Sequence, residues 1–119
     1  MGEKMKQFLA IYIGSPTGQK SAKWNALSEG QRQEQIQIGM KAWKDWVTKN
    51  QNSLVGMGSP LGKTKLVNPD GLSDTKNAMA AYTVVQAETH EAAAKLFLNH
   101  PHFTIFPGDS VEVMECLPI

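Results

Sequence analysis

Two stretches of the sequence decide the fold: residues 8–13 read FLAIYI, and residues 79–86 read MAAYTVVQ. Alternate side chains of a strand point to opposite faces of a sheet. In the first stretch both the even-numbered and the odd-numbered side chains are apolar, and the second stretch is largely so. This pattern is typical of central strands that are covered on both faces.

A long amphipathic helix is predicted between these strands. Ser28 suits the N-cap, and Gln31 follows at the spacing of a capping box. Apolar residues then recur at intervals of three and four and include Met40 and Trp43, so we expect a core-facing stripe on a helix that runs to about Gln51.

A second helix is predicted to begin after the N-cap Thr89 and to end before Pro101, which cannot continue the hydrogen-bond ladder. The sequence Asn68-Pro69-Asp70-Gly71 is a strong turn signal, and the glycines around Ser59 indicate a strand irregularity. The remaining expectations are strands at 53–57, 63–67 and 111–117, a polar connection at 19–27, and loops at 71–77 and 102–107.

This order of elements predicts one α+β domain over residues 1–119 with ferredoxin-like β-α-β-β-α-β topology. Its four-stranded antiparallel sheet would carry two helices on one face. The central strands are apolar on both faces, so the other face needs a cover. A second copy of the chain is the simplest one, and we therefore predict a sheet-to-sheet homodimer.

Composition narrows the class of protein. The chain has 12 Lys and Arg against 11 Asp and Glu, a net charge of +1, which argues against nucleic-acid binding. A single cysteine excludes an internal disulfide, and no apolar run is long enough to span a membrane. We expect a cytoplasmic protein whose native first residue is Met1 or Met5.

A set of different short motifs is spread along the whole chain. They are Met5-Lys6, Trp24, Leu27-Ser28, Gly58-Ser59-Pro60-Leu61, Asp70-Gly71, an alanine-rich helix at 92–97, and VEVME at 111–115. With these motifs, the segment from Met5 to Ile119 resembles the YCII-related family of the dimeric α+β barrel superfamily. Residues 69–76 are similar to the acidic-glycine loop of its DGPF branch, although the Asp-Gly-Pro-Phe motif itself is missing.

The resemblance implies a ferredoxin-like protomer, a sheet-to-sheet homodimer, and a pocket between sheet and helices. One type of member resembles an enzyme in which a histidine of the first helix and an aspartate of the cleft form a dyad. Residues 24–51 of this chain contain no histidine, so that dyad does not carry over.

Candidate catalytic residues are His100, His102 and Asp74. His100-Pro101-His102 follows the second helix, where an imidazole can serve as a general acid or base with Asp74 as its orienting partner. The alternative is structural: His100 ends a helix and His102 bonds to backbone. Asp70 is most simply a turn residue.

Candidate ligand-binding residues are Trp24, Trp43, Tyr82 and Ser59. The tryptophans can form an aromatic wall for a flat ligand or can pack in the core. Tyr82 has a hydroxyl that can donate to a ligand or to a backbone carbonyl.

Two functions remain open. The first is a small-molecule enzyme of isomerase or lyase type that uses His102 or His100 without a cofactor. The second is a non-catalytic domain that binds a small ligand or serves assembly. The sequence predicts neither a metal site nor an organic cofactor, because the spacing of its His and Cys residues does not suit a metal and no cofactor motif is present.

Overall fold

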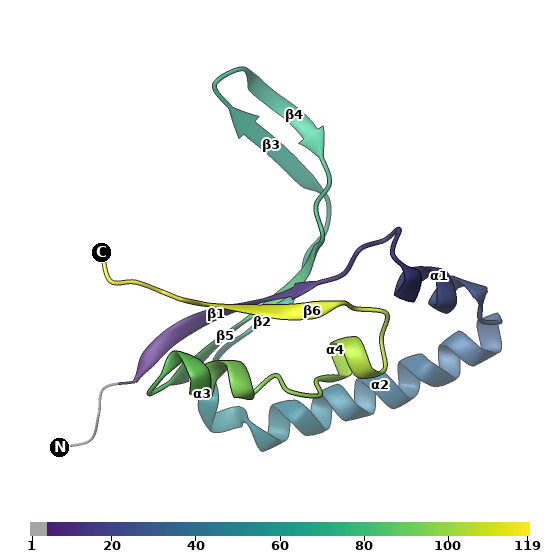
Figure 1. Ribbon diagram of the computed structural model, residues 1–119, viewed down its shortest axis with the longest axis horizontal. Coiled ribbons are helices and arrows are strands. Elements are labelled where there is room, and N and C mark those ends of the chain that lie inside the picture. Colours follow the sequence, from purple (N-terminus) through teal and green to yellow (C-terminus); the bar gives the residue numbers. More distant parts are fainter. Residues whose placement is uncertain (1–4) are drawn as a thin grey trace.

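The computed structural model describes residues 5–119 (Figure 1). The choice between Met1 and Met5 involves residues 1–4, which lie outside the described part. The elements in chain order are β1 (Lys6–Ile13), α1 (Gln19–Ala26), α2 (Glu29–Lys49), the 3-10 turn η1 (Gln51–Ser53), β2 (Leu54–Pro60), β3 (Thr64–Asn68), β4 (Gly71–Thr75), β5 (Met79–Ala87), α3 (His90–Lys95), α4 (Pro101–Thr104) and β6 (Ser110–Glu115).

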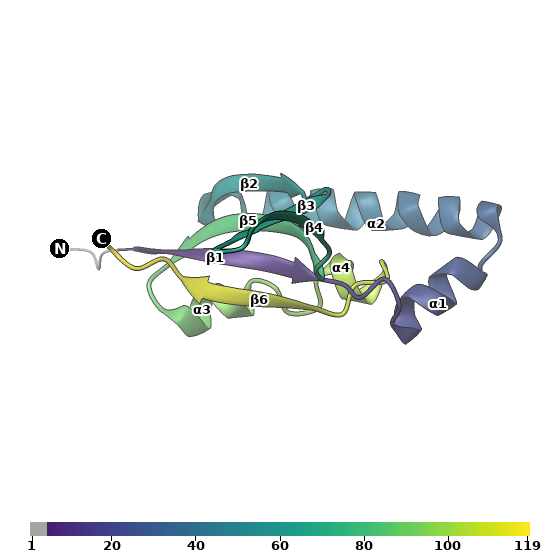
Figure 2. The same ribbon diagram turned by 90° about the horizontal axis from the view of Figure 1, so that it is seen from above.

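The main sheet has four antiparallel strands in the order β2-β5-β1-β6, which is the ferredoxin-like arrangement (Figure 2). Helices α2, α3 and α4 lie together on one side of this sheet, and α1 lies beyond one end of it (Figure 1). The predicted fold class is therefore confirmed for the single chain. The two-stranded hairpin β3-β4 rises from the opposite side.

The two faces of β1 differ in their environment. Phe8, Ala10 and Tyr12 face the helices and are fully buried, while the alternate residues Leu9 and Ile11 are half-buried on the open face. The buried core under the sheet consists of Phe8, Ala10, Tyr12, Val85, Ala87, Ala93 and Phe97. One apolar face of the central strand thus closes the core, and the other remains uncovered in the single chain.

Helix α2 begins as predicted. The Ser28 hydroxyl accepts from the Gln31 backbone N–H at 3.1 Å, and the Gln31 side chain accepts from the Ser28 N–H at 2.9 Å. Its core stripe is narrower than expected, because Met40 is 61% exposed. Gly39 is the buried residue of this helix, since the ring of Phe106 packs where a Cβ would stand.

Three expectations about loops are wrong. Residues 19–26 form α1, which the Lys20 ammonium ties to the carbonyls of Phe103 and Gly108 at 2.8 and 2.9 Å. Pro101–Thr104 forms the short helix α4 within the predicted 102–107 loop. The helix α1 depends on these contacts with residues distant in sequence, whereas α4 has a local cap, because the His100 side chain accepts from the His102 N–H and Pro101 is its first residue.

The third correction concerns residues 71–77. The predicted turn is present, with the Asn68 side chain accepting from the Asp70 N–H at 2.9 Å. The chain then continues as β4, which pairs residue by residue with β3. Cross-strand pairing, including an ion pair between Lys65 and Asp74, stabilises a strand whose composition is that of a loop.

The expected irregularity near Ser59 is confirmed, because β2 changes register against β5 on both sides of Gly56. Gly58 has a φ of +71°, and a Cβ there would collide with the backbone of Tyr82. The bulge therefore requires glycine at this position.

Substituting Gly58 with Ala should lower the free energy of unfolding by about 1–3 kcal/mol, because alanine meets both an unfavourable φ and the Tyr82 carbonyl. Urea unfolding measures this change. Gly56→Ala is the matched control, since a Cβ there meets no atom within 4 Å. Equal stability of the two variants would contradict the role of Gly58.

Candidate functional site

His100 lies at the centre of an aromatic cluster under the sheet. Its side chain is 0% exposed. The centre of its ring is 4.5 Å from that of Trp43, 4.7 Å from Trp46, 5.1 Å from Tyr12 and 5.8 Å from Phe97. Rings from β1, from α2 and from Phe97, which follows α3, therefore enclose the imidazole on several sides.

The hydrogen bonds of His100 fix its tautomer. Nδ1 accepts from the backbone N–H of His102 at 3.0 Å, so His100 caps α4 and its own proton sits on Nε2. Nε2 is buried and has no hydrogen-bond partner in the described part of the chain. Burial, together with the neighbouring His102, lowers the pKa of His100 to about 4. The ring is thus neutral near pH 7 and is packed as a core residue.

His102 is also committed to the backbone. Its Nε2 lies 2.8 Å from the carbonyl oxygen of Ile13 and must donate to it, because a carbonyl only accepts. The residue is 7% exposed, and a Cβ on Gly108 would collide with its ring. Burial lowers the pKa of His102, while the Ile13 bond and the nearby Asp109 charge act in the opposite direction.

Asp109 and Lys20 are polar neighbours of His102 that the sequence patterns did not single out. A carboxylate oxygen of Asp109 accepts from the Ser15 N–H at 2.8 Å. Lys20 donates to two carbonyls of the same region, those of Phe103 and Gly108. These groups hold the end of β1, the start of α1 and the entry to β6 together. The position of Asp109 after the Pro107-Gly108 turn is the one signal that could have marked it.

Asp74 is not brought together with the histidines. It lies on β4 of the hairpin, forms its ion pair with Lys65, and is exposed, whereas α4 lies on the other side of the sheet (Figure 1). It borders a hollow of about 560 Å³ at the root of the hairpin. Lys63, Lys65 and Lys76 also line that hollow.

The predicted ligand-binding residues lie in three different places. Trp43 packs in the core cluster, and Trp24 lies on α1 with its ring 6.0 Å from that of Phe106. Tyr82 and Ser59 are cross-strand neighbours on the sheet, in β5 and β2. The Ser59 hydroxyl donates to the adjacent Pro60 carbonyl at 2.7 Å. The structure thus does not gather these four side chains around one cavity.

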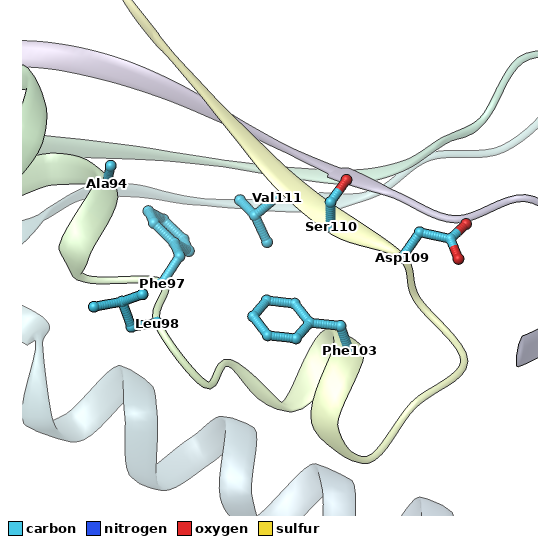
Figure 3. A pocket seen from close by; sticks show the side chains of 7 residues that line it. All are labelled: Ala94, Phe97, Leu98, Phe103, Asp109, Ser110 and Val111. Carbon is cyan, nitrogen blue, oxygen red and sulfur yellow. The ribbon is translucent and has the colours of Figure 1, made fainter.

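A second hollow, of about 260 Å³, lies between α3, α4 and the edge strand β6. Its lining residues are Ala94, Phe97, Leu98, Phe103, Asp109, Ser110 and Val111. Figure 3 shows the two phenyl rings, Leu98 and Val111 around this space, while the Asp109 carboxylate and the Ser110 hydroxyl point away from it. Carbon atoms therefore form most of its lining, and polar atoms form the rest.

Within residues 5–119, no three His, Cys, Asp or Glu side chains are grouped so that they could hold a metal ion. Over the same residues, no helix has the length and hydropathy needed to cross a membrane.

Neither a protein-family model nor a curated protein matches this chain. Among solved structures, the backbone is similar to 5-chloro-2-hydroxyhydroquinone dehydrochlorinase (TftG) from Burkholderia phenoliruptrix AC1100, in a complex with 2,5-dihydroxybenzoquinone. The TM-score is 0.48 at 13% identity, over 90% of this chain and 89% of that one. No residue role follows from this likeness, and membership of the YCII-related family stays a prediction.

The buried His100 predicts a pH-dependent stability. In the unfolded chain its pKa is about 6.5 and in the fold about 4, so between these values the unfolded chain binds the proton more tightly. His100 alone should therefore lower the free energy of unfolding by about 2 kcal/mol from pH 7 to pH 5. Urea unfolding of the wild type and of His100→Asn, which keeps a capping side chain but does not titrate, measures the difference. The same pH slope in both proteins would contradict the assignment to His100.

Proposed function

We propose that this chain binds a small apolar ring compound in the hollow between α3, α4 and β6, without chemistry on the ligand. The observation that carries this proposal is the mainly apolar lining of that hollow, from which the Asp109 carboxylate and the Ser110 hydroxyl point away (Figure 3). Two phenyl rings, those of Phe97 and Phe103, offer offset or edge contacts to a flat ligand. A volume of about 260 Å³ suits a single ring rather than a larger cofactor.

The state of the histidines favours binding over acid–base catalysis. His100 is enclosed by aromatic rings and its pKa is lowered to about 4. His102 already donates its Nε2 proton to the Ile13 carbonyl. A general acid or base must reach a proton of the substrate, and neither imidazole lines the hollow.

A cavity-filling variant tests ligand binding. Monocyclic aromatic compounds such as phenol should raise the melting temperature of the wild type by several degrees, because a ligand at 100 times its dissociation constant adds about 2.7 kcal/mol. Ala94→Phe should abolish this shift by occupying the hollow. Ala92→Phe, on the same helix but not in the lining, is the control and should retain it. Shifts that persist in Ala94→Phe would place the ligand elsewhere.

Acid–base catalysis by His102 is the second candidate function. It is favoured by Asp109, which borders the hollow and also acts electrostatically on His102. Mass spectrometry of compounds that stabilise the protein distinguishes the two functions. A bound compound that is recovered unchanged supports binding alone. Conversion that is lost in His102→Gln, with the thermal shift kept, would replace the binding proposal by an enzyme.

The proposal includes a homodimer formed through the open face of the sheet. Leu9, Ile11 and Ile13 of β1 are half-buried there, and Val84 and Tyr82 of β5 lie opposite the first two. A contiguous apolar face of this kind is rarely left to water in a stable protein. A two-fold axis through the sheet would cover it with an identical face.

Ile11→Lys should dissociate this dimer, because two-fold symmetry brings two added charges into one apolar contact. The dissociation constant should rise by at least a hundredfold in sedimentation equilibrium. Ile38→Lys is the matched control, since Ile38 is an exposed isoleucine of α2. If the wild type is monomeric at tens of micromolar, the dimer proposal is wrong, while the proposal of ligand binding still stands.

A further inference from the structure

The hairpin β3-β4 extends away from the rest of the chain. It leaves the sheet between β2 and β5 on the side opposite to the helices (Figure 1). Seen from above, it stands over the central strands β5 and β1 (Figure 2). Almost all of its residues are exposed. A two-stranded hairpin is at best marginally stable in water when nothing packs against it.

One face of this hairpin is apolar near its turn. Val67 lies directly opposite Leu72, and the two side chains are 76% and 71% exposed. Two residues further along the same face, Lys65 and Asp74 form their ion pair. We name this the Val67–Leu72 face. These two side chains form a small exposed apolar patch, a kind of surface that a contact with another molecule covers.

The area of the sheet indicates that the open face alone is small for a stable dimer. With strands of eight and nine residues, four strands present a face of roughly 500 Å², against about 800 Å² per partner in a standard interface. Each face of the hairpin adds roughly 170 Å². A second copy that contacts both the open face of the sheet and the hairpin buries an area closer to that of a standard interface.

The charges of the hairpin also favour a second copy. Residues 63–76 carry Lys63, Lys65 and Lys76 against two aspartates. Residues 109–115, which form the edge strand β6 and its entry, carry three acidic residues and no basic one. The hairpin thus has a net charge of +1 and the edge segment one of −3, so contact between the hairpin of one copy and the edge strand of another is electrostatically favourable.

We propose that the Val67–Leu72 face packs against a second copy of this chain, so that each hairpin extends the sheet-to-sheet interface. This inference rests on the proposed homodimer. It gives the hairpin the role of an arm that reaches across from one protomer to the other.

The test is the double variant Val67→Thr/Leu72→Thr, which keeps residues suited to strands and removes the apolar contact. In sedimentation equilibrium the dimer dissociation constant should rise at least tenfold. Ile38→Thr/Met40→Thr on α2 is the matched control, since it also replaces two exposed apolar residues and should leave the constant unchanged.

The outcomes separate the arm from the dimer. A dimer that is equally tight in Val67→Thr/Leu72→Thr would overturn the arm while leaving the sheet-to-sheet dimer in place. A monomeric wild type would overturn both. Should the variant fail to fold, hydrogen exchange of the wild type decides: residues 64–75 should be protected at high protein concentration and lose protection on dilution. Protection that does not change with concentration would overturn the arm.

Discussion

The contact of Tyr12 with the aromatic residues beneath the sheet holds the layers of this protein together. Its ring, on the central strand β1, lies 5.1 Å from those of Trp43 and His100, 5.2 Å from His102 and 6.0 Å from Phe97. The Tyr12 hydroxyl pairs with the Thr83 hydroxyl at 3.0 Å, and Thr83 in turn donates to the Met57 carbonyl at 3.3 Å. Burial raises the pKa of Tyr12 to about 12, so it stays neutral. A single side chain thereby links β1, β5 and β2 with α2 and the α3–α4 segment.

This packing determines where the chain can interact with other molecules. The space between the middle of the sheet and α2 is filled by rings, and Trp46 adds a bond from its indole N–H to the Leu96 carbonyl at 2.7 Å. The apolar hollow is therefore displaced to the edge, under β6. Further apolar surface lies on the opposite face of the sheet and on the hairpin, and exposed apolar side chains such as Ile38 and Met40 lie on α2.

Patterns that act locally were predictable from the sequence. The capping box of Ser28, the cap of Thr89, the turn at Asn68 and the central position of β1 and β5 all follow from neighbouring residues. The elements that were missed depend on distant partners: α1 on carbonyls of residues 103 and 108, and β4 on its pairing with β3. The same holds for the candidate site. The histidines stand out by composition, but only tertiary packing shows that one is enclosed by rings and that Asp109, not Asp74, lies near the other.

The ring cluster around His100 also makes the molecule optically sensitive to its own protonation. Trp43 and Trp46 both meet the imidazole edge to face, at 90° and 70° between ring planes. A proton on His100 would place a cation beside two indoles that otherwise lie in an apolar setting. Tryptophan emission should therefore report this one buried titration through Trp43 and Trp46, whereas Trp24 on α1 contacts Phe106 and not His100.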